Sequence, residues 1–191
     1  MALTQFIWDQ PNKMVLSTSN TLDLLINGTP KQRRAYAVLL CHNVFTTLRS
    51  FSPVLVGTIP LNVDTAESDL DILCCWSDEQ LFIEAINISF STFPNFSLEQ
   101  KLLGDHRTVI ARFALDEFPV EIFGQDRPVE AQEGYRHLVI EHAILLHKGD
   151  AFRQAVVQLK QRGIKTEPAF AKLLGLPGDP YEALLLYQVP T

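Results

Sequence analysis

The stretch PVLVGTIPLNVDTAESDLDIL, residues 53–73, decides the fold. An apolar run leads into Gly57 and Thr58, and after an irregular polar segment a second apolar run carries Asp69 and Asp71. Because strand side chains alternate between faces, the two carboxylates project together, with Cα atoms about 6–7 Å apart. Ionised carboxylates at that distance repel by about 2.5 kcal/mol at an effective dielectric of about 20. A divalent cation is the simplest group that would stabilise such a pair.

A third acidic residue interrupts a later apolar strand. Within residues 118–123, Glu121 lies on the opposite face from Val120 and Ile122. An acidic side chain in such a strand is costly unless it is solvated or paired. Taken alone, Glu121 could be a solvent-facing acid of an edge strand. Together with the two earlier aspartates, it suggests one carboxylate site.

Composition describes an ordinary globular protein, with 191 residues, 47% hydrophobic and 20% charged. The net charge of −6 argues against nucleic acid as the partner, because phosphate binding depends on basic patches, although a local patch stays open. Cys41, Cys74 and Cys75 give no disulfide framework and no zinc spacing. No signal peptide and no apolar run of about 18–20 residues is found, so we expect a cytoplasmic protein without membrane contact.

The predicted elements form an α+β fold, or mixed α/β, built from a mixed β-sheet with flanking helices and a C-terminal helical subdomain. Residues 1–19 are poorly patterned and could form a short helix or a surface strap. We place the boundary near Arg127, giving a core of residues 1–127 and a subdomain of residues 128–191. Helices are expected at 20–26, 31–48 (capped by Thr29), 79–90 (capped by Ser77), 130–147, 151–161, 168–174 and 181–187, and strands at 53–56, 69–76, 96–103, 108–115 and 118–123.

The order of these motifs resembles the nucleotidyltransferase superfamily, which includes DNA polymerase beta, the kanamycin and lincosamide nucleotidyltransferases and the minimal nucleotidyltransferases. In that pattern a strand precedes Gly-Ser, a spacer follows, then Asp-apolar-Asp, and a third acid lies on a later strand. Here Gly57-Thr58, Asp69-Leu70-Asp71 and Glu121 carry the pattern, within residues 35–125. Residues 165–171 and 178–181 are similar to a bacterial family of this superfamily with no assigned function.

The resemblance implies transfer of a nucleoside monophosphate from a nucleoside triphosphate to a hydroxyl of a small-molecule acceptor lying between the sheet and the helical tail. Asp69 and Asp71 would hold Mg²⁺ or Mn²⁺, and Glu121 would help to bind the catalytic metal and to activate the acceptor. Two such ions stabilise both the attacking and the leaving oxygens. The amides of Gly57 and Thr58, with the Thr58 hydroxyl, would cradle the triphosphate.

Two features depart from the family pattern. Thr58 stands where serine is usual, and the spacer carries Asp64 and Glu67 but no Lys or Arg. A triphosphate therefore needs positive charge from elsewhere in the chain. The basic residues that could reach phosphate are Lys101, Arg107, Arg112, Arg136 and Lys148, none of them singled out by spacing, and solvated surface charge is the simpler interpretation of all five.

The alternative is a non-catalytic nucleotide- or partner-binding module on the same fold, since fold does not imply function. An enzyme requires at least one Lys or Arg near Thr58, whereas such a module does not. The sequence predicts that His142 is a hydrogen-bonded histidine of the hydrophobic core, and that His137 and Glu141, four residues apart, form a surface pair. Lys165 and Glu167 are candidates for a substrate-facing role.

Overall fold

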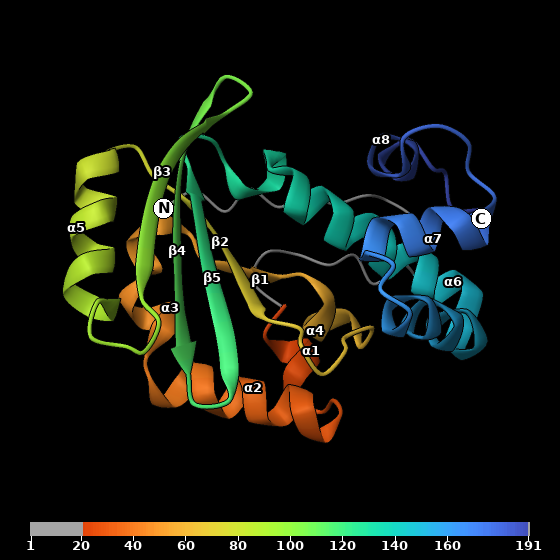
Figure 1. Ribbon diagram of the computed structural model, residues 1–191, viewed down its shortest axis with the longest axis horizontal. Coiled ribbons are helices and arrows are strands. Elements are labelled where there is room, and N and C mark those ends of the chain that lie inside the picture. The colour runs from red at the N-terminus through yellow and green to blue at the C-terminus, as the bar shows by residue number, and fades with distance from the viewer. Residues whose placement is uncertain (1–20, 191) are drawn as a thin grey trace, which may run out of the picture.

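A five-stranded mixed sheet forms the centre of the fold, in the order β1-β2-β5-β4-β3 (Figure 1). The structure is a computed structural model that describes residues 21–190, so the expectation for residues 1–19 lies outside the described part. β2 and β5 run parallel, and the other neighbours are antiparallel. This confirms the predicted α+β class. The strands are β1 (Val54–Val56), β2 (Leu70–Cys75), β3 (Ser97–Leu103), β4 (His106–Leu115) and β5 (Phe118–Gln125).

Helices lie on both faces of the sheet (Figure 1). Those before the last strand are α1 (Asp23–Ile26), α2 (Pro30–Cys41), α3 (Val44–Thr47), α4 (Thr58–Leu61) and α5 (Glu79–Phe90), with the 3₁₀ turn η1 (Arg49–Phe51). Those after it are α6 (Glu133–Gln161), α7 (Thr166–Leu174) and α8 (Pro180–Leu185), with η2 (Val129–Ala131).

Local capping chemistry explains where the early helices begin and end. Thr29 caps α2 as predicted, in a reciprocal capping box with Gln32. The predicted helix over 31–48 was too long, because Asn43 adopts a left-handed φ of 53° and separates α2 from α3. The predicted cap of α5 was one residue early, since the Asp78 carboxylate, and not Ser77, accepts from the backbone amides of Gln80 and Leu81.

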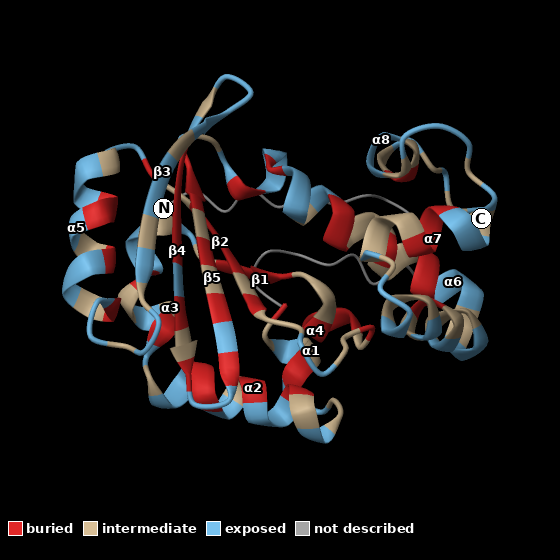
Figure 2. Cartoon of the chain, viewed as in Figure 1, coloured by how far each residue is buried: buried red, intermediate tan, exposed pale blue. Residues whose placement is uncertain are grey.

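Because its side chains alternate between the two faces of the sheet, β2 contributes to two separate hydrophobic cores. Leu70 and Ile72 face the core shared with α1, α2, α3 and α5. Leu73 faces the opposite way and joins Val54 and Val56 in a second core with α6, α7 and α8. Figure 2 shows many buried residues along β1, β2, β4 and β5, whereas the edge strand β3 is mostly exposed. The face that carries Leu73 is also the face of Asp71, so the helical tail packs beside the candidate site.

The helical tail begins with two helices joined at a sharp bend. Gly149, at φ 74° and ψ −170°, is non-helical inside α6, in agreement with the predicted separation at this residue. A domain boundary near Arg127 stays a prediction, because α6 and the sheet contribute to one core. The three cysteines are free thiols. Among residues 21–190, no helix combines the length and apolarity needed to cross a membrane.

Candidate functional site

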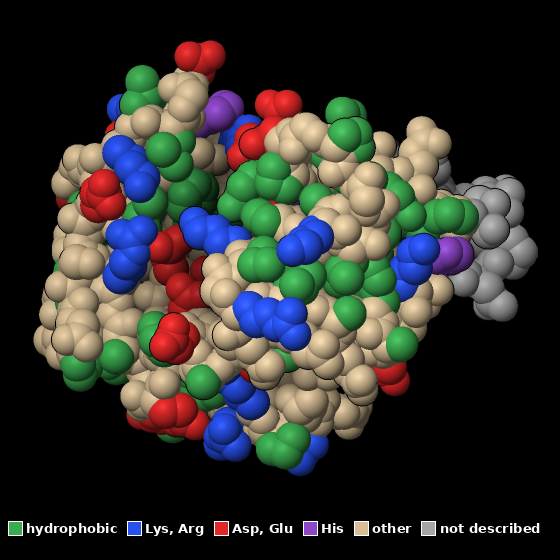
Figure 3. Space-filling model, turned by 45° about the vertical axis from the view of Figure 1, so that its right-hand side comes forward, with side chains coloured by type: hydrophobic (Ala, Val, Ile, Leu, Met, Phe, Trp, Pro, Cys, Tyr) green, Lys and Arg blue, Asp and Glu red, His purple; other side chains and the backbone are tan. Residues whose placement is uncertain are grey.

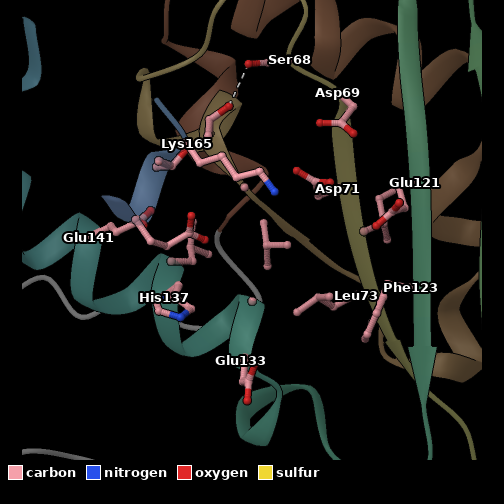
Figure 4. A pocket seen from close by; sticks show the side chains of 18 of the residues that line it. Ser68, Asp69, Asp71, Leu73, Glu121, Phe123, Glu133, His137, Glu141 and Lys165 are labelled. Atoms are coloured by element: carbon pink, nitrogen blue, oxygen red, sulfur yellow. Dashed lines mark hydrogen bonds between the residues drawn. The ribbon is translucent and has the colours of Figure 1, made fainter. Parts of the chain in front are cut away.

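Strand pairing brings the predicted acids to one place. Asp71 and Glu121 are direct partners in the parallel pair β2–β5, and Asp69 precedes β2 by one residue. Neighbouring strands lie about 4.8 Å apart, so the two partners are within reach of one shared ion. All three side chains line the same cavity, and Figure 4 shows their carboxylates along the adjacent strands.

Gly57 is required by its backbone and by its contact with Asp71. Its φ of 77° and ψ of −156° belong to a region that residues with a Cβ rarely adopt. A Cβ placed there would lie 2.1 Å from Oδ2 of Asp71. The end of β1 therefore passes directly against the carboxylate, and only glycine allows this close approach.

The loop between α4 and β2 is fixed by Ser68 and by a distant lysine. The Thr58 hydroxyl donates to Ser68 Oγ at 3.1 Å, and the Thr65 amide donates to the same oxygen at 2.9 Å. Lys31 of α2 forms an ion pair with Asp64 at 3.0 Å. One of the two acids of the spacer is thus neutralised from outside it, so the spacer is less repulsive to a phosphate than its sequence indicates.

Asp71 is held in an environment that disfavours its charged form. Burial raises the pKa of its carboxyl from 3.8 to about 8, and the nearby Asp69 and Glu121 contribute to this rise, while Lys160 opposes them. A bound cation would remove this penalty, because it compensates the clustered negative charge. The electrostatics of the metal-free site thus match an ion-binding role for Asp71.

Glu121 already has one cationic partner. Arg112, its cross-strand neighbour on β4, reaches Oε2 at 2.7 Å and also contacts Glu99 at 3.5 Å. One carboxylate oxygen of Glu121 remains for other ligands. The donor set of Asp69, Asp71 and Glu121 is all oxygen and fits Mg²⁺ or Mn²⁺, which prefer carboxylates and water. Arg112 is therefore an ion-pair partner of Glu121, and not only a solvated surface charge.

A cavity of about 1070 Å³ separates the sheet from the helical tail. Figure 3 shows acidic side chains at the bottom of a hollow with lysine and arginine side chains around it. Thr58, Lys160, Lys165 and Arg127 all line it. Of the five basic residues considered from sequence, none lines the cavity. Lys160 went unrecognised because it lies on a helix far along the chain, with no motif around it.

The wall opposite the sheet is polar, which the sequence did not indicate. His137 and Glu141 are 7% and 4% exposed, so the prediction of a surface pair was wrong. Burial raises the pKa of Glu141 well above its usual value, and the nearby Glu167 adds to this rise. Burial lowers the pKa of Lys160, against the pull of Glu141 and other acids. Lys165 and Glu167 line the cavity, as expected for substrate-facing residues, but their roles stay a prediction.

Residues 37–187 match the family described as "Domain of unknown function (DUF4269)". The chain belongs to this family. The match contains both strands that carry the acids and the whole helical wall, so the complete cavity lies within the unit that defines the family. No curated protein matches the chain.

Solved structures that match this chain have the nucleotidyltransferase fold. The structure of the GLD-2/RNP-8 complex matches with a TM-score of 0.50 and 13% identity, over 83% of this chain and 63% of that one. A Cid1 poly(U) polymerase bound to MgGTP matches with a TM-score of 0.49 and 11% identity, over 84% and 50%. At this identity the likeness shows the nucleotidyltransferase fold alone. The chain spans less than two thirds of the length of either structure.

The expectation that nucleic acid is not a partner was wrong. Structures that match include a cytoplasmic RNA terminal U-transferase and a poly(U) polymerase, which are proteins named for their action on RNA. The error has a physical source, since a net charge of −6 averages over the whole surface. Partner choice depends on the local field, and this cavity carries Lys160, Lys165 and Arg127.

Proposed function

We propose that this protein transfers a nucleoside monophosphate from a nucleoside triphosphate to a hydroxyl group, with Mg²⁺ or Mn²⁺ as cofactor. The observation that supports this most is the pairing of Asp71 with Glu121 across β2 and β5, with Asp69 beside them and Gly57 against the Asp71 carboxylate. A titratable group with a strongly perturbed pKa, lying in a cavity with other convergent polar groups, marks a candidate functional site.

Each residue of the site has a proposed role. Asp69 and Asp71 bind the metal ions, which neutralise phosphate charge and stabilise the attacking and leaving oxygens. Glu121 uses its free oxygen at the same site, while Arg112 fixes its orientation through the 2.7 Å ion pair. The amides of Gly57 and Thr58 offer hydrogen bonds to the triphosphate, and glycine keeps the approach open. Lys160 and Lys165 supply positive charge on the opposite wall.

Basic residues at the cavity favour the enzyme over a non-catalytic module. Lys160 and Lys165 line the same cavity as Thr58, and Lys160 is near enough to Asp71 to affect its pKa. A lysine between two acidic clusters is well placed to stabilise the negative charge that develops on the leaving pyrophosphate. The non-catalytic module remains the second candidate, and it predicts nucleotide binding without turnover.

The acceptor is proposed to enter between the sheet and the helical tail. A volume of about 1070 Å³ exceeds what one nucleotide needs, since drug-sized ligands occupy cavities of about 300–1,000 Å³. The remaining space suits the hydroxyl of a small molecule or the 3′ end of an RNA. Both classes of acceptor therefore belong in the assay.

Nucleotide binding and transfer can be tested on one set of proteins. Thermal unfolding is measured with each of the four nucleoside triphosphates, with and without Mg²⁺, for the wild type, Asp71→Asn and the exposed-loop control Asp105→Asn. A Mg²⁺-dependent rise in Tm that only Asp71→Asn abolishes supports the site, because ligand binding stabilises the folded state by mass action.

Turnover is followed with α-labelled nucleotides on an RNA oligonucleotide and on a set of small polyols and aminoglycosides. Labelled product that depends on Asp71 supports the enzyme. Nucleotide binding without product on either class of acceptor would favour the non-catalytic module, and no shift with any nucleotide would refute both.

A further inference from the structure

The helical wall of the cavity carries a second cluster of metal-ligating side chains, separate from the acids of the sheet. His137 and Glu141 lie on one face of α6, four residues apart, and Glu167 belongs to the first turn of α7. One ligand atom from each of the three lies within 4.8 Å of the other two. Figure 4 places His137 and Glu141 on the wall that faces Asp69, Asp71 and Glu121.

Two of these side chains have buried polar atoms without a partner. Among the described residues, His137 Nδ1 and Glu141 Oε1 accept or donate no hydrogen bond, although the side chains are 7% and 4% exposed. Buried polar groups are almost always satisfied, so each unsatisfied atom in a buried site requires an explanation, and a bound ion is one of them. Both residues line the cavity, so a ligand can reach them from there.

Lysine does not satisfy the cluster. Lys160 lines the same cavity and its field reaches Glu141 and Glu167, but within residues 21–190 neither carboxylate forms an ion pair at 4.0 Å or less. The ring of Tyr181 packs edge-on against His137 with centroids 6.1 Å apart, which fixes the imidazole plane without using its nitrogens for a hydrogen bond. The imidazole of His137 is therefore held in position, and the two carboxylates have no ion-pair partner among residues 21–190.

We propose that His137, Glu141 and Glu167 bind one divalent transition metal ion, best matched by Zn²⁺. One imidazole and two carboxylates are a mixed nitrogen and oxygen set, which suits Zn²⁺ and is a poor match for Mg²⁺. Ligand atoms around one zinc ion lie about 3–4 Å apart, so small side-chain rotations close the site. Three protein ligands leave one position open toward the cavity, and the ion links α6 to α7.

This second site does not depend on the proposed nucleotidyl transfer. It uses none of Asp69, Asp71 or Glu121, and it lies on the other wall of the cavity. The test therefore uses Asp71→Asn as the background, because that substitution impairs the first site and spares the second. Failure of nucleotide binding and failure of zinc binding then appear as separate results.

Calorimetric titration with Zn²⁺, and with Co²⁺ as a coloured substitute, is carried out on Asp71→Asn alone and combined with His137→Gln or Glu167→Gln. We expect one Zn²⁺ per chain in the background protein, and binding at least about tenfold weaker in each combined variant. The Co²⁺-bound background protein should show a visible absorption band that both combined variants lose. His142→Gln, on the same helix and outside the cavity lining, is the matched control and should change neither result.

Three results would overturn the proposal. Absence of Zn²⁺ binding in the background protein would refute it, as would binding that survives both His137→Gln and Glu167→Gln. The proposal also fails if His137→Gln and Glu167→Gln, made in the wild-type chain, weaken nucleotide binding while the same substitutions leave Zn²⁺ affinity intact in the background protein, since the cluster would then recognise the nucleotide. Glu167 is only partly buried, so Glu167→Gln keeps the test valid if His137→Gln does not fold.

Discussion

Asp71→Asn should make the metal-free protein more stable while it removes the proposed function. In the folded protein the Asp71 carboxyl has a pKa of about 8, against 3.8 in the unfolded chain. Between about pH 4 and about pH 8 the folded state therefore holds a proton that the unfolded state has already released, so the stability of the folded state falls as the pH rises through that window. Asparagine has the shape of the protonated acid and cannot ionise, so it escapes this loss.

The size of the effect follows from the shift. At about pH 7, some three units above the unfolded pKa, the linkage amounts to roughly 4 kcal/mol at 1.36 kcal/mol per unit. Because solvent reaches part of this side chain, we expect about 2–4 kcal/mol of stabilisation in the variant. For a chain of this size that corresponds to a Tm higher by roughly 5–15 °C.

The assay is thermal and urea unfolding in EDTA at about pH 7 and again at about pH 4. The variant should be more stable than the wild type at the higher pH. The difference should shrink at the lower pH, close to the unfolded pKa of 3.8, where ionisation of the carboxyl stabilises the unfolded state only slightly. Millimolar Mg²⁺ should raise the Tm of the wild type and leave the variant unchanged. Asp105→Asn, on an exposed turn, should match the wild type throughout. A metal-free Asp71→Asn protein that is no more stable than the wild type would refute the electrostatic reasoning.

Two further predictions concern the backbone and the opposite wall. Gly57→Ala should lower the free energy of unfolding in urea by roughly 2–4 kcal/mol, since it combines backbone strain with a Cβ 2.1 Å from Asp71 Oδ2. The control is Gly178→Ala, at a residue with a positive φ but open space around it, and it should lower the free energy of unfolding by less. Equal losses in the two variants would show that the collision with Asp71 does not matter. Lys160→Met should reduce the rise in Tm that nucleotide causes in the presence of Mg²⁺, whereas Lys172→Met, at an exposed residue, should not. An unchanged rise in Lys160→Met would show that Lys160 does not contact the phosphates.

Local sequence was sufficient for the elements that surround the sheet site. The alternation of Leu70, Asp71 and Ile72 predicts a strand with one acidic face. In the structure these residues belong to β2, and Leu70 and Ile72 do face the core. Gly57, before α4, and Glu121, an acid within an apolar strand, could also be recognised from their neighbours in the sequence. Side-chain alternation and turn chemistry depend on a few neighbouring residues, so they can be predicted from the sequence.

The helical wall could not be predicted in this way. In α6, Leu138 and Leu145 lie in the core, but His137 and Glu141 were assigned to solvent because polar side chains on a helix normally face water. Their surroundings depend on α7, which brings Glu167 beside them from a distant part of the chain. Helical periodicity indicates which face is apolar, and it does not indicate what covers the other one.

The sequence by itself therefore determined the class of fold and the strand in or beside which Asp69 and Asp71 lie. Tertiary structure alone decided that Glu121 stands directly opposite Asp71, that Arg112 takes one of its oxygens, and that a second, histidine-containing wall faces the acids. The physical reason is separation along the chain. Parallel pairing of β2 with β5 and the return of α6 and α7 over the sheet join residues whose local patterns carry no information about one another.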